Sequence, residues 1–150
     1  MHFLISLIPL FLRREATTNG VNTFPRTFIL VLRAYLELLL FDLYLGHGSF
    51  SKLHNKVRTY PCRKHTFPPG EEARICAAVD MAAIWYWKQI LCLQRSVATT
   101  RLLRQRGFPA EMIIGTHLMP FKAHAWVEVG GRVVSDKPYM HEIYQPLDRC

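Results

Sequence analysis

Three residues in the second half of the chain have the types and the order of a thiol-based catalytic triad, namely Cys92, His124 and Asp136. A cysteine thiolate is a nucleophile, a histidine can take the thiol proton and pass it to a leaving amine, and a carboxylate can fix the tautomer of the imidazole ring. Cys92 stands at the predicted start of a helix, where unsatisfied N–H groups and the positive end of the helix dipole favour the thiolate. The three residues therefore predict covalent catalysis through a thioester.

The same residue types also have an ordinary structural interpretation. A lone cysteine in a helix is usually a small buried hydrophobe, and a histidine close to a tryptophan more often packs than reacts. Cys76 is the rival nucleophile, but it lies inside a predicted helix next to Ile75, where a buried thiol would be inert. Cys150 is the last residue, and we expect it to fray. The pattern alone leaves the triad open, and it ranks Cys92 above Cys76.

A thioester mechanism also needs donors for the oxyanion, and the sequence offers several. The backbone N–H of Cys92 is one candidate. The side-chain amide of Gln89 and the indole N–H of Trp85 or Trp87 are the other candidates. The sequence does not indicate which of these groups donates to the oxyanion.

The first half of the chain predicts helical structure followed by a connector. Apolar residues recur at spacings of three and four between residues 27 and 45, which predicts one long helix. We expect its apolar face to pack either on the domain's own core or on a partner; that face carries Phe28, Leu32, Tyr35, Leu36, Leu39 and Leu43. Residues 50–70 are rich in basic residues and proline, so we expect an irregular connector there. We therefore divide the chain into an N-terminal region, 1–70, and a core, 71–150.

The core region predicts two helices and then a sheet. One helix should begin at the acidic pair Glu71-Glu72 and continue to Tyr86, and the next should span about Leu93–Arg106 and stop at Gly107. After Gly107 the spacing of the apolar residues changes to that typical of strands. It predicts a short buried strand at 112–114 and two further strands at 123–129 and 132–135. Helices followed by antiparallel strands predict an α+β domain.

His124 lies on the first of the last two predicted strands and Asp136 stands at the end of the second, so the register between the strands decides whether the two side chains meet. A two-residue loop at Gly130-Gly131 would place Asp136 on the opposite face of the sheet from His124. A contact therefore predicts either a three-residue loop over residues 129–131, with a glycine at positive φ, or a bulge within the strands. We expect either this loop or a bulge, with Asp136 at one imidazole nitrogen of His124 and the sulfur of Cys92 near the other nitrogen.

Composition argues against several other classes of protein. The formal net charge of +8 is spread along the chain without interleaved aromatic residues, which argues against nucleic-acid binding. Met1–Leu12 is apolar but lacks a basic leader and a small-residue cleavage site, so it is a poor signal peptide. A membrane span over 27–45 would bury three charges, those of Arg33, Glu37 and Asp42. We expect a cytoplasmic protein without a membrane span.

Two familiar ligand signatures are missing as well. The chain has no G-x-x-x-x-G-K phosphate loop, and no second pair of ligands follows Cys62-x-x-His65 at zinc spacing. The four cysteines follow no secreted disulfide pattern, which favours a reducing compartment. We therefore expect no metal and no bound cofactor.

Residues 91–135 resemble the transglutaminase-like cysteine peptidase domain of the lasso-peptide maturation B proteins, the microcin-processing group. The spacings of 32 residues from Cys92 to His124 and 12 from His124 to Asp136 also fit that family. The matching motifs are Cys92-Leu93-x-Arg95-Ser96-Val97-Ala98, Leu102-Leu103-Arg104-x-Arg106-Gly107, Ile114-Gly115, Pro120-Phe121-x-Ala123-His124-Ala125-Trp126-Val127-Glu128, Gly131 and Val133-Val134-x-Asp136.

This resemblance implies a transglutaminase- or papain-like core, with the nucleophile at a helix N-terminus packed on an antiparallel sheet. It implies a leader peptidase that cleaves a ribosomally made precursor peptide, after which a separate asparagine-synthetase-like cyclase uses ATP to close the lasso ring. We find no small β-rich recognition domain before Cys92, so we expect the stand-alone peptidase half of a split system that relies on a separate leader-recognition protein. Two alternatives stay open: a non-catalytic adaptor that binds the leader or the cyclase, and a transglutaminase-like acyltransferase.

Overall fold

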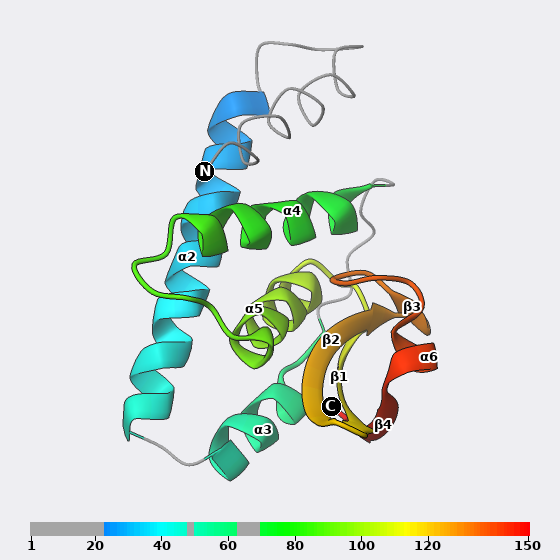
Figure 1. Cartoon of the computed structure of the whole chain (residues 1–150). Coiled ribbons are helices and arrows are strands. Elements are labelled where there is room, and N and C mark those ends of the chain that lie inside the picture. Colours follow the sequence, from blue (N-terminus) through cyan, green and yellow to red (C-terminus); the bar gives the residue numbers. More distant parts are fainter. Residues whose placement is uncertain (1–22, 48–49, 63–69) are drawn as a thin grey trace, which may run out of the picture.

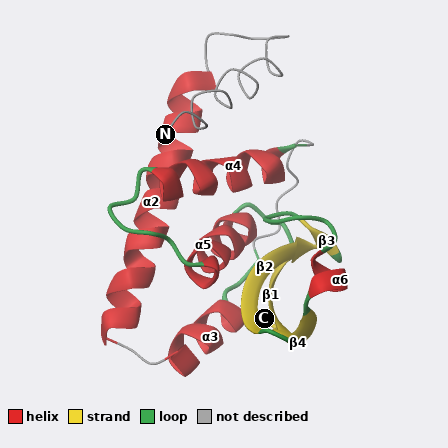
Figure 2. Cartoon of the chain, viewed as in Figure 1, coloured by secondary structure: helices red, strands yellow, loops and turns green. Residues whose placement is uncertain are grey.

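The computed structural model describes residues 23–47, 50–62 and 70–150 and contains a group of helices beside one sheet (Figures 1 and 2). The predicted apolar segment Met1–Leu12 lies outside these residues. Within them, no helix combines the length and apolar character needed to cross a membrane. In chain order the elements are α2 (Thr23–His47), α3 (Phe50–Thr59), α4 (Glu71–Ile84), α5 (Cys92–Gln105), β1 (Ala110–Leu118), β2 (Phe121–Val129), β3 (Arg132–Val133), α6 (Met140–Ile143) and β4 (Gln145–Arg149).

The predicted α+β class is confirmed. The four strands form one antiparallel sheet in the order β3-β2-β1-β4. Helix α5 contacts β1 and β2 on one side and α2 and α4 on the other, so it forms the centre of the molecule (Figure 1). The first residue of this central helix is Cys92, which places the thiol where the helices meet the sheet.

Helix α2 belongs to the same hydrophobic core as the later helices. Its side chains Leu30, Ala34 and Leu38 are buried in one cluster with residues of α4, α5 and β2. The face that we singled out in the sequence is a different one, since Leu36 and Leu43 are largely exposed. Helix α2 is apolar around much of its circumference, so the periodicity showed a helix and did not show which face is buried.

The segment predicted as an irregular connector begins with a helix, α3. Leu53 and Val57 are buried in a second cluster, and the helix ends at Thr59, just before Pro61. The buried guanidinium of Arg104 donates from Nη1 to the carbonyl oxygen of Val57, at 2.5 Å. The prolines therefore limit the length of α3 but do not prevent its formation.

The end of the chain is a strand, which the sequence did not predict. Strand β4 pairs antiparallel with β1, and beyond it the N–H of Cys150 donates to the carbonyl oxygen of Met112, at 3.0 Å. The N–H of Met112 donates back to Cys150 at 2.7 Å, and the cysteine side chain is buried. The expectation that Cys150 frays is therefore wrong, because backbone pairing holds the last residue.

Gly115 occupies a position on β1 that has no room for a side chain. A Cβ atom there would lie 2.7 Å from one ring carbon of Trp126 and 3.0 Å from the carbonyl oxygen of Gln145. We expect Gly115→Ala to lower the free energy of unfolding by about 1–3 kcal/mol, because Trp126 or β4 must move. Urea denaturation measures the change. Gly46→Ala is the matched control, since nothing lies within 4 Å of its Cβ, and an equal loss in both variants would contradict this explanation.

Candidate active site

The turn that precedes Asp136 is a regular two-residue hairpin. Val129 pairs with Arg132, and Gly130 and Gly131 both have positive φ, at 57° and 77°. The prediction of a three-residue loop or a bulge is therefore wrong. Two consecutive residues at positive φ match the backbone twist of a tight hairpin, which glycine adopts without strain.

His124 and Asp136 nevertheless meet, because the ladder ends before it reaches them. The last backbone bond of the hairpin runs from Val134 N–H to Val127 O, at 2.9 Å. The N–H of Val127 then donates to the hydroxyl of Ser135, at 2.8 Å, instead of to a backbone carbonyl. The chain bends at this point, and a carboxylate oxygen of Asp136 lies 2.8 Å from Nε2 of His124. The contact forms despite the two-residue turn because regular pairing does not continue to residue 136.

Cys92 is half-buried at the first position of α5. Leu91 before it is extended and provides no side-chain cap, so the first N–H groups of the helix remain available. A hydrogen bond with His124 lowers the pKa of the Cys92 thiol, against the opposing effect of partial burial. Backbone hydrogen bonds from Ala125 and Leu93 and the charge of His124 act in the same direction. The site therefore favours the thiolate.

His124 lies between the thiol and the carboxylate. The hydrogen bond with Cys92 raises the pKa of His124, burial opposes this, and Asp136 adds to the increase. Because Asp136 engages Nε2, Nδ1 is the ring nitrogen that can exchange a proton with the thiol. The ring of His124 also stacks on the rings of Tyr144, with centroids 5.4 Å apart, and of Trp126, with centroids 6.4 Å apart. These stacking contacts restrict the orientation of the imidazole plane.

Asp136 is held as a carboxylate. Partial burial would raise its pKa, but hydrogen bonds from His124 and from the N–H of Lys137, with the charges of His124 and Arg95, outweigh burial and leave the pKa lowered. A carboxylate that is ionised in this position can orient the ring of His124 and stabilise its protonated form.

An open cleft of about 610 Å³ surrounds these side chains. Gln89 lines the cleft, whereas the side chains of Trp85 and Trp87 are mostly exposed and neither residue is part of the lining. Of the three side-chain oxyanion candidates, the structure therefore brings only Gln89 to the site. The complete lining consists of Asp80, Ala83, Ile84, Gln89, Ile90, Leu91, Cys92, Arg95, His124 and Asp136.

Sequence reasoning missed the charged pair that flanks the triad. Arg95 lies 3.3 Å from Asp136 and 3.4 Å from Asp80 of α4. The pKa of Asp80 is raised by burial and by the charge of Asp136, although Arg95 opposes both. Arg95 could have been found, because it follows Cys92 by three residues and so shares a helix face with it. Nothing in the sequence distinguishes Asp80.

The other cysteines have environments unlike that of Cys92. Burial raises the pKa of Cys76 to about 12 and that of Cys150 to about 11, and nearby carboxylates add to both shifts. The predicted ranking of Cys92 above Cys76 therefore agrees with the environment of each thiol. Cys62 is exposed, and its companion His65 in the zinc-like pattern lies outside the described residues.

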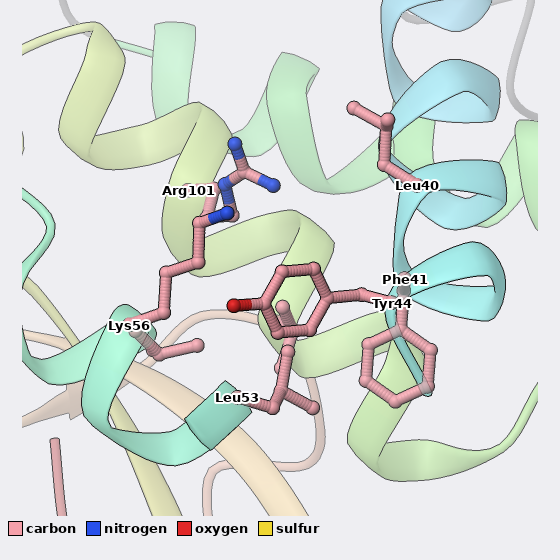
Figure 3. A pocket seen from close by; sticks show the side chains of 8 residues that line it. Leu40, Phe41, Tyr44, Leu53, Lys56 and Arg101 are labelled. Carbon is pink, nitrogen blue, oxygen red and sulfur yellow. The ribbon is translucent and has the colours of Figure 1, made fainter. Parts of the chain in front are cut away.

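A second, smaller cavity of about 100 Å³ lies between α2, α3 and α5 (Figure 3). Lys56 covers the ring of Tyr44 there, with its Nζ 4.4 Å from the ring centroid. The lining contains no cysteine, histidine or carboxylate, so it offers no nucleophile or base; it comprises Leu40, Phe41, Tyr44, Leu53, Lys56, Val57, Val97 and Arg101.

Comparison with known proteins identifies the family to which this arrangement belongs. The sequence model of the Transglutaminase-like superfamily matches residues 37–149. The chain belongs to the transglutaminase-like superfamily. It is also 45% identical over 51 residues to the Microcin J25-processing protein McjB of Escherichia coli, a match that covers 34% of this chain and 24% of that relative. This match confirms the resemblance to microcin-processing proteins, although it spans only about a quarter of the relative's length. No solved structure matches the chain significantly.

Proposed function

We propose that this transglutaminase-like protein is a cysteine peptidase that removes the leader from a precursor peptide in lasso-peptide biosynthesis. The observation that carries the proposal is the contact of His124 with Asp136 beside a half-buried thiol whose pKa is lowered by His124. The similarity to a microcin-processing protein supports the choice of substrate class. The chemistry requires no metal or bound cofactor in this chain, and ATP would be used by a separate asparagine-synthetase-like cyclase.

The first half-reaction forms a thioester. The Cys92 thiolate attacks the carbonyl carbon of the scissile peptide bond, and the backbone N–H of Cys92 with the amide of Gln89 stabilises the oxyanion. Protonated His124 then gives its proton to the leaving amine, which departs as the new N-terminus of the core peptide. The leader remains bound to the sulfur as an acyl group.

The second half-reaction releases the leader. Neutral His124 takes a proton from a water molecule, whose oxygen attacks the thioester carbon. Collapse of the second tetrahedral intermediate releases the leader as a carboxylic acid and restores the thiolate and the imidazolium. An amine in place of this water would give acyl transfer, so the identity of the second nucleophile separates a peptidase from an acyltransferase.

The proposal is tested by incubating the protein with its precursor peptide, with and without a separate leader-recognition protein. We expect slow cleavage by this chain alone and at least about tenfold faster cleavage with the partner, because presenting the leader raises the effective concentration of the scissile bond. Mass spectrometry identifies both products. Free leader acid and intact core support the peptidase, whereas leader joined to an amine supports the acyltransferase.

The apolar face of α2 that is turned away from the core is the docking surface we propose for this recognition protein. It carries five exposed apolar side chains: Phe28, Ile29, Leu32, Leu36 and Leu43. Leu32 and Leu36 each lie two residues, about 200° around the helix, from residues that pack in the core. A continuous apolar stripe of this kind typically marks a protein interface.

Leu36→Glu tests this docking surface. We expect it to remove the stimulation by the partner and to leave the slow basal cleavage unchanged, because a charge at the centre of the stripe opposes burial. Leu147→Glu is the matched control, since Leu147 is also an exposed leucine but lies on β4. Equal stimulation of both variants would contradict this docking surface. Full turnover without any partner would contradict the proposal of a separate recognition protein.

A further inference from the structure

Arg95 connects three separate parts of the chain at the edge of the active site. It lies one turn of α5 after Cys92, and its Nη1 atom is 3.4 Å from a carboxylate oxygen of Asp80 on α4. Its Nη2 atom donates to the carbonyl oxygen of Ser135, at 2.8 Å, and to Oδ2 of Asp136, at 3.3 Å. One guanidinium therefore contacts both the backbone and the side chain of the segment that carries the carboxylate.

This segment needs such a contact because it has left the sheet. Pairing between β2 and β3 ends after Val134, and Asp136 lies in the bend that follows. The hydroxyl of Ser135 and the N–H of Lys137 supply its nearby hydrogen bonds. Arg95 adds an attachment from a different element, the same helix that carries the nucleophile.

The atom that Arg95 contacts is also informative. Oδ2 of Asp136 is the oxygen that lies 2.8 Å from Nε2 of His124. The planar fork of an arginine can hold two acceptors at fixed relative positions, which the ammonium group of a lysine cannot do. Arg95 therefore fixes the oxygen that orients the imidazole, and α5 sets the positions of Cys92 and Asp136 together.

We propose that Arg95 is a positioning residue that holds Asp136 against His124 and, through these two residues, supports the reactive thiolate of Cys92. The inference deepens the proposed peptidase function and shares its triad. Arg95 takes no part in bond making or breaking. Its effect should depend on the presence of the Asp136 carboxylate, and this dependence separates positioning from a direct effect of its positive charge on the thiol.

The test follows the pH dependence of alkylation of Cys92 by iodoacetamide, which needs no peptide substrate. Trypsin places Cys92 in the peptide Gln89–Arg95 of the wild-type protein and in Gln89–Arg101 of the Arg95→Gln variant. Neither peptide contains another cysteine, so mass spectrometry reads the modification of Cys92 alone. At about pH 6 we expect Arg95→Gln to slow the alkylation of Cys92 by roughly three- to tenfold. This change in rate corresponds to an increase of about half to one unit in the pKa of the thiol. At alkaline pH the rates should converge.

The double variant decides the mechanism. In an Asp136→Ala background, Arg95→Gln should cause no further change in the alkylation profile, because the group through which it acts is gone. A shift of the same size in both backgrounds, or no shift in either, overturns the proposal. Arg101→Gln is the matched control, since Arg101 also lies on α5 and pairs with a carboxylate, that of Glu37, away from the cleft.

Precursor cleavage gives the second measurement. Arg95→Gln should lower kcat and leave KM nearly unchanged, because orientation of His124 matters in the chemical step. If the wild-type protein cleaves no precursor while the alkylation profiles behave as expected, the peptidase proposal fails and the positioning role stands. If circular dichroism shows that Arg95→Gln is unfolded, Arg95→Lys replaces it, with the same direction of shift expected and an unchanged profile again contradicting the role.

Discussion

Replacement of Cys92 by alanine is expected to reduce precursor cleavage by at least about 10³-fold while the fold is retained. The attack on the scissile carbonyl requires a thiolate, and the pKa of Cys92 is lowered whereas those of Cys76 and Cys150 are raised. Cys92 is only half-buried, so loss of its sulfur should affect stability little. Release of free leader, followed by mass spectrometry at equal protein concentration, measures the effect.

Cys76→Ala is the control for this prediction, and we expect it to keep most of the activity. Its thiol is buried in α4 outside the lining of the cleft. Cleavage that survives in Cys92→Ala, or that is lost only in Cys76→Ala, would show that the nucleophile is assigned wrongly. If a complete pathway still matures its product with Cys92→Ala, the protein is a non-catalytic adaptor.

The sequence predicted the elements of the core well because each has a strong local signal. The acidic pair at Glu71 marks the start of α4, and Gly107 with the proline after Phe108 marks the end of α5. The alternation around Gly130-Gly131 located the hairpin for the same reason. Such signals depend on a few neighbouring residues, so one sequence suffices to find them.

The elements that were missed or misplaced depend on distant parts of the chain. Strand β4 is short and exposed and forms because β1 offers a free edge. Helix α3 is stabilised when Leu53 and Val57 join a cluster with Val97 and Met112, residues far from it in the sequence. The buried face of α2 is chosen by the surface of α4 and α5, which the periodicity of α2 does not contain.

The candidate site shows the same division. Cys92, His124 and Asp136 could be predicted, because their types and order suit a thiol nucleophile and because residues 91–135 resemble a known family. The way in which Asp136 reaches His124 could not, because it depends on the hydroxyl of Ser135 replacing a ladder acceptor. The contribution of Asp80 also required coordinates, because α4 is placed beside α5 only by the fold.

Asp136→Ala is expected to lower kcat by about 10²- to 10⁴-fold, because the imidazole of His124 loses both its orientation and the charge that stabilises its protonated form. Asp148→Ala is the matched control. Asp148 also lies 2.8 Å from a histidine nitrogen, that of His54, but it belongs to β4 and does not line the cleft. Equal losses in the two variants would mean that Asp136 acts only through stability.

The pH profile separates the charge of Asp136 from its position. The pKa of Cys92 is lowered and that of His124 is raised, which favours the thiolate–imidazolium pair that the proposed mechanism uses. Activity should therefore rise with pH as Cys92 loses its proton and fall at higher pH as His124 loses its own. Removing the carboxylate lowers the pKa of His124, and the less populated imidazolium stabilises the thiolate less, so the pKa of Cys92 rises. The rise in activity should therefore shift to higher pH and the fall in activity to lower pH. A profile of Asp136→Ala that is lower in height but unchanged in width would contradict the electrostatic role and leave Asp136 as a steric support for the ring.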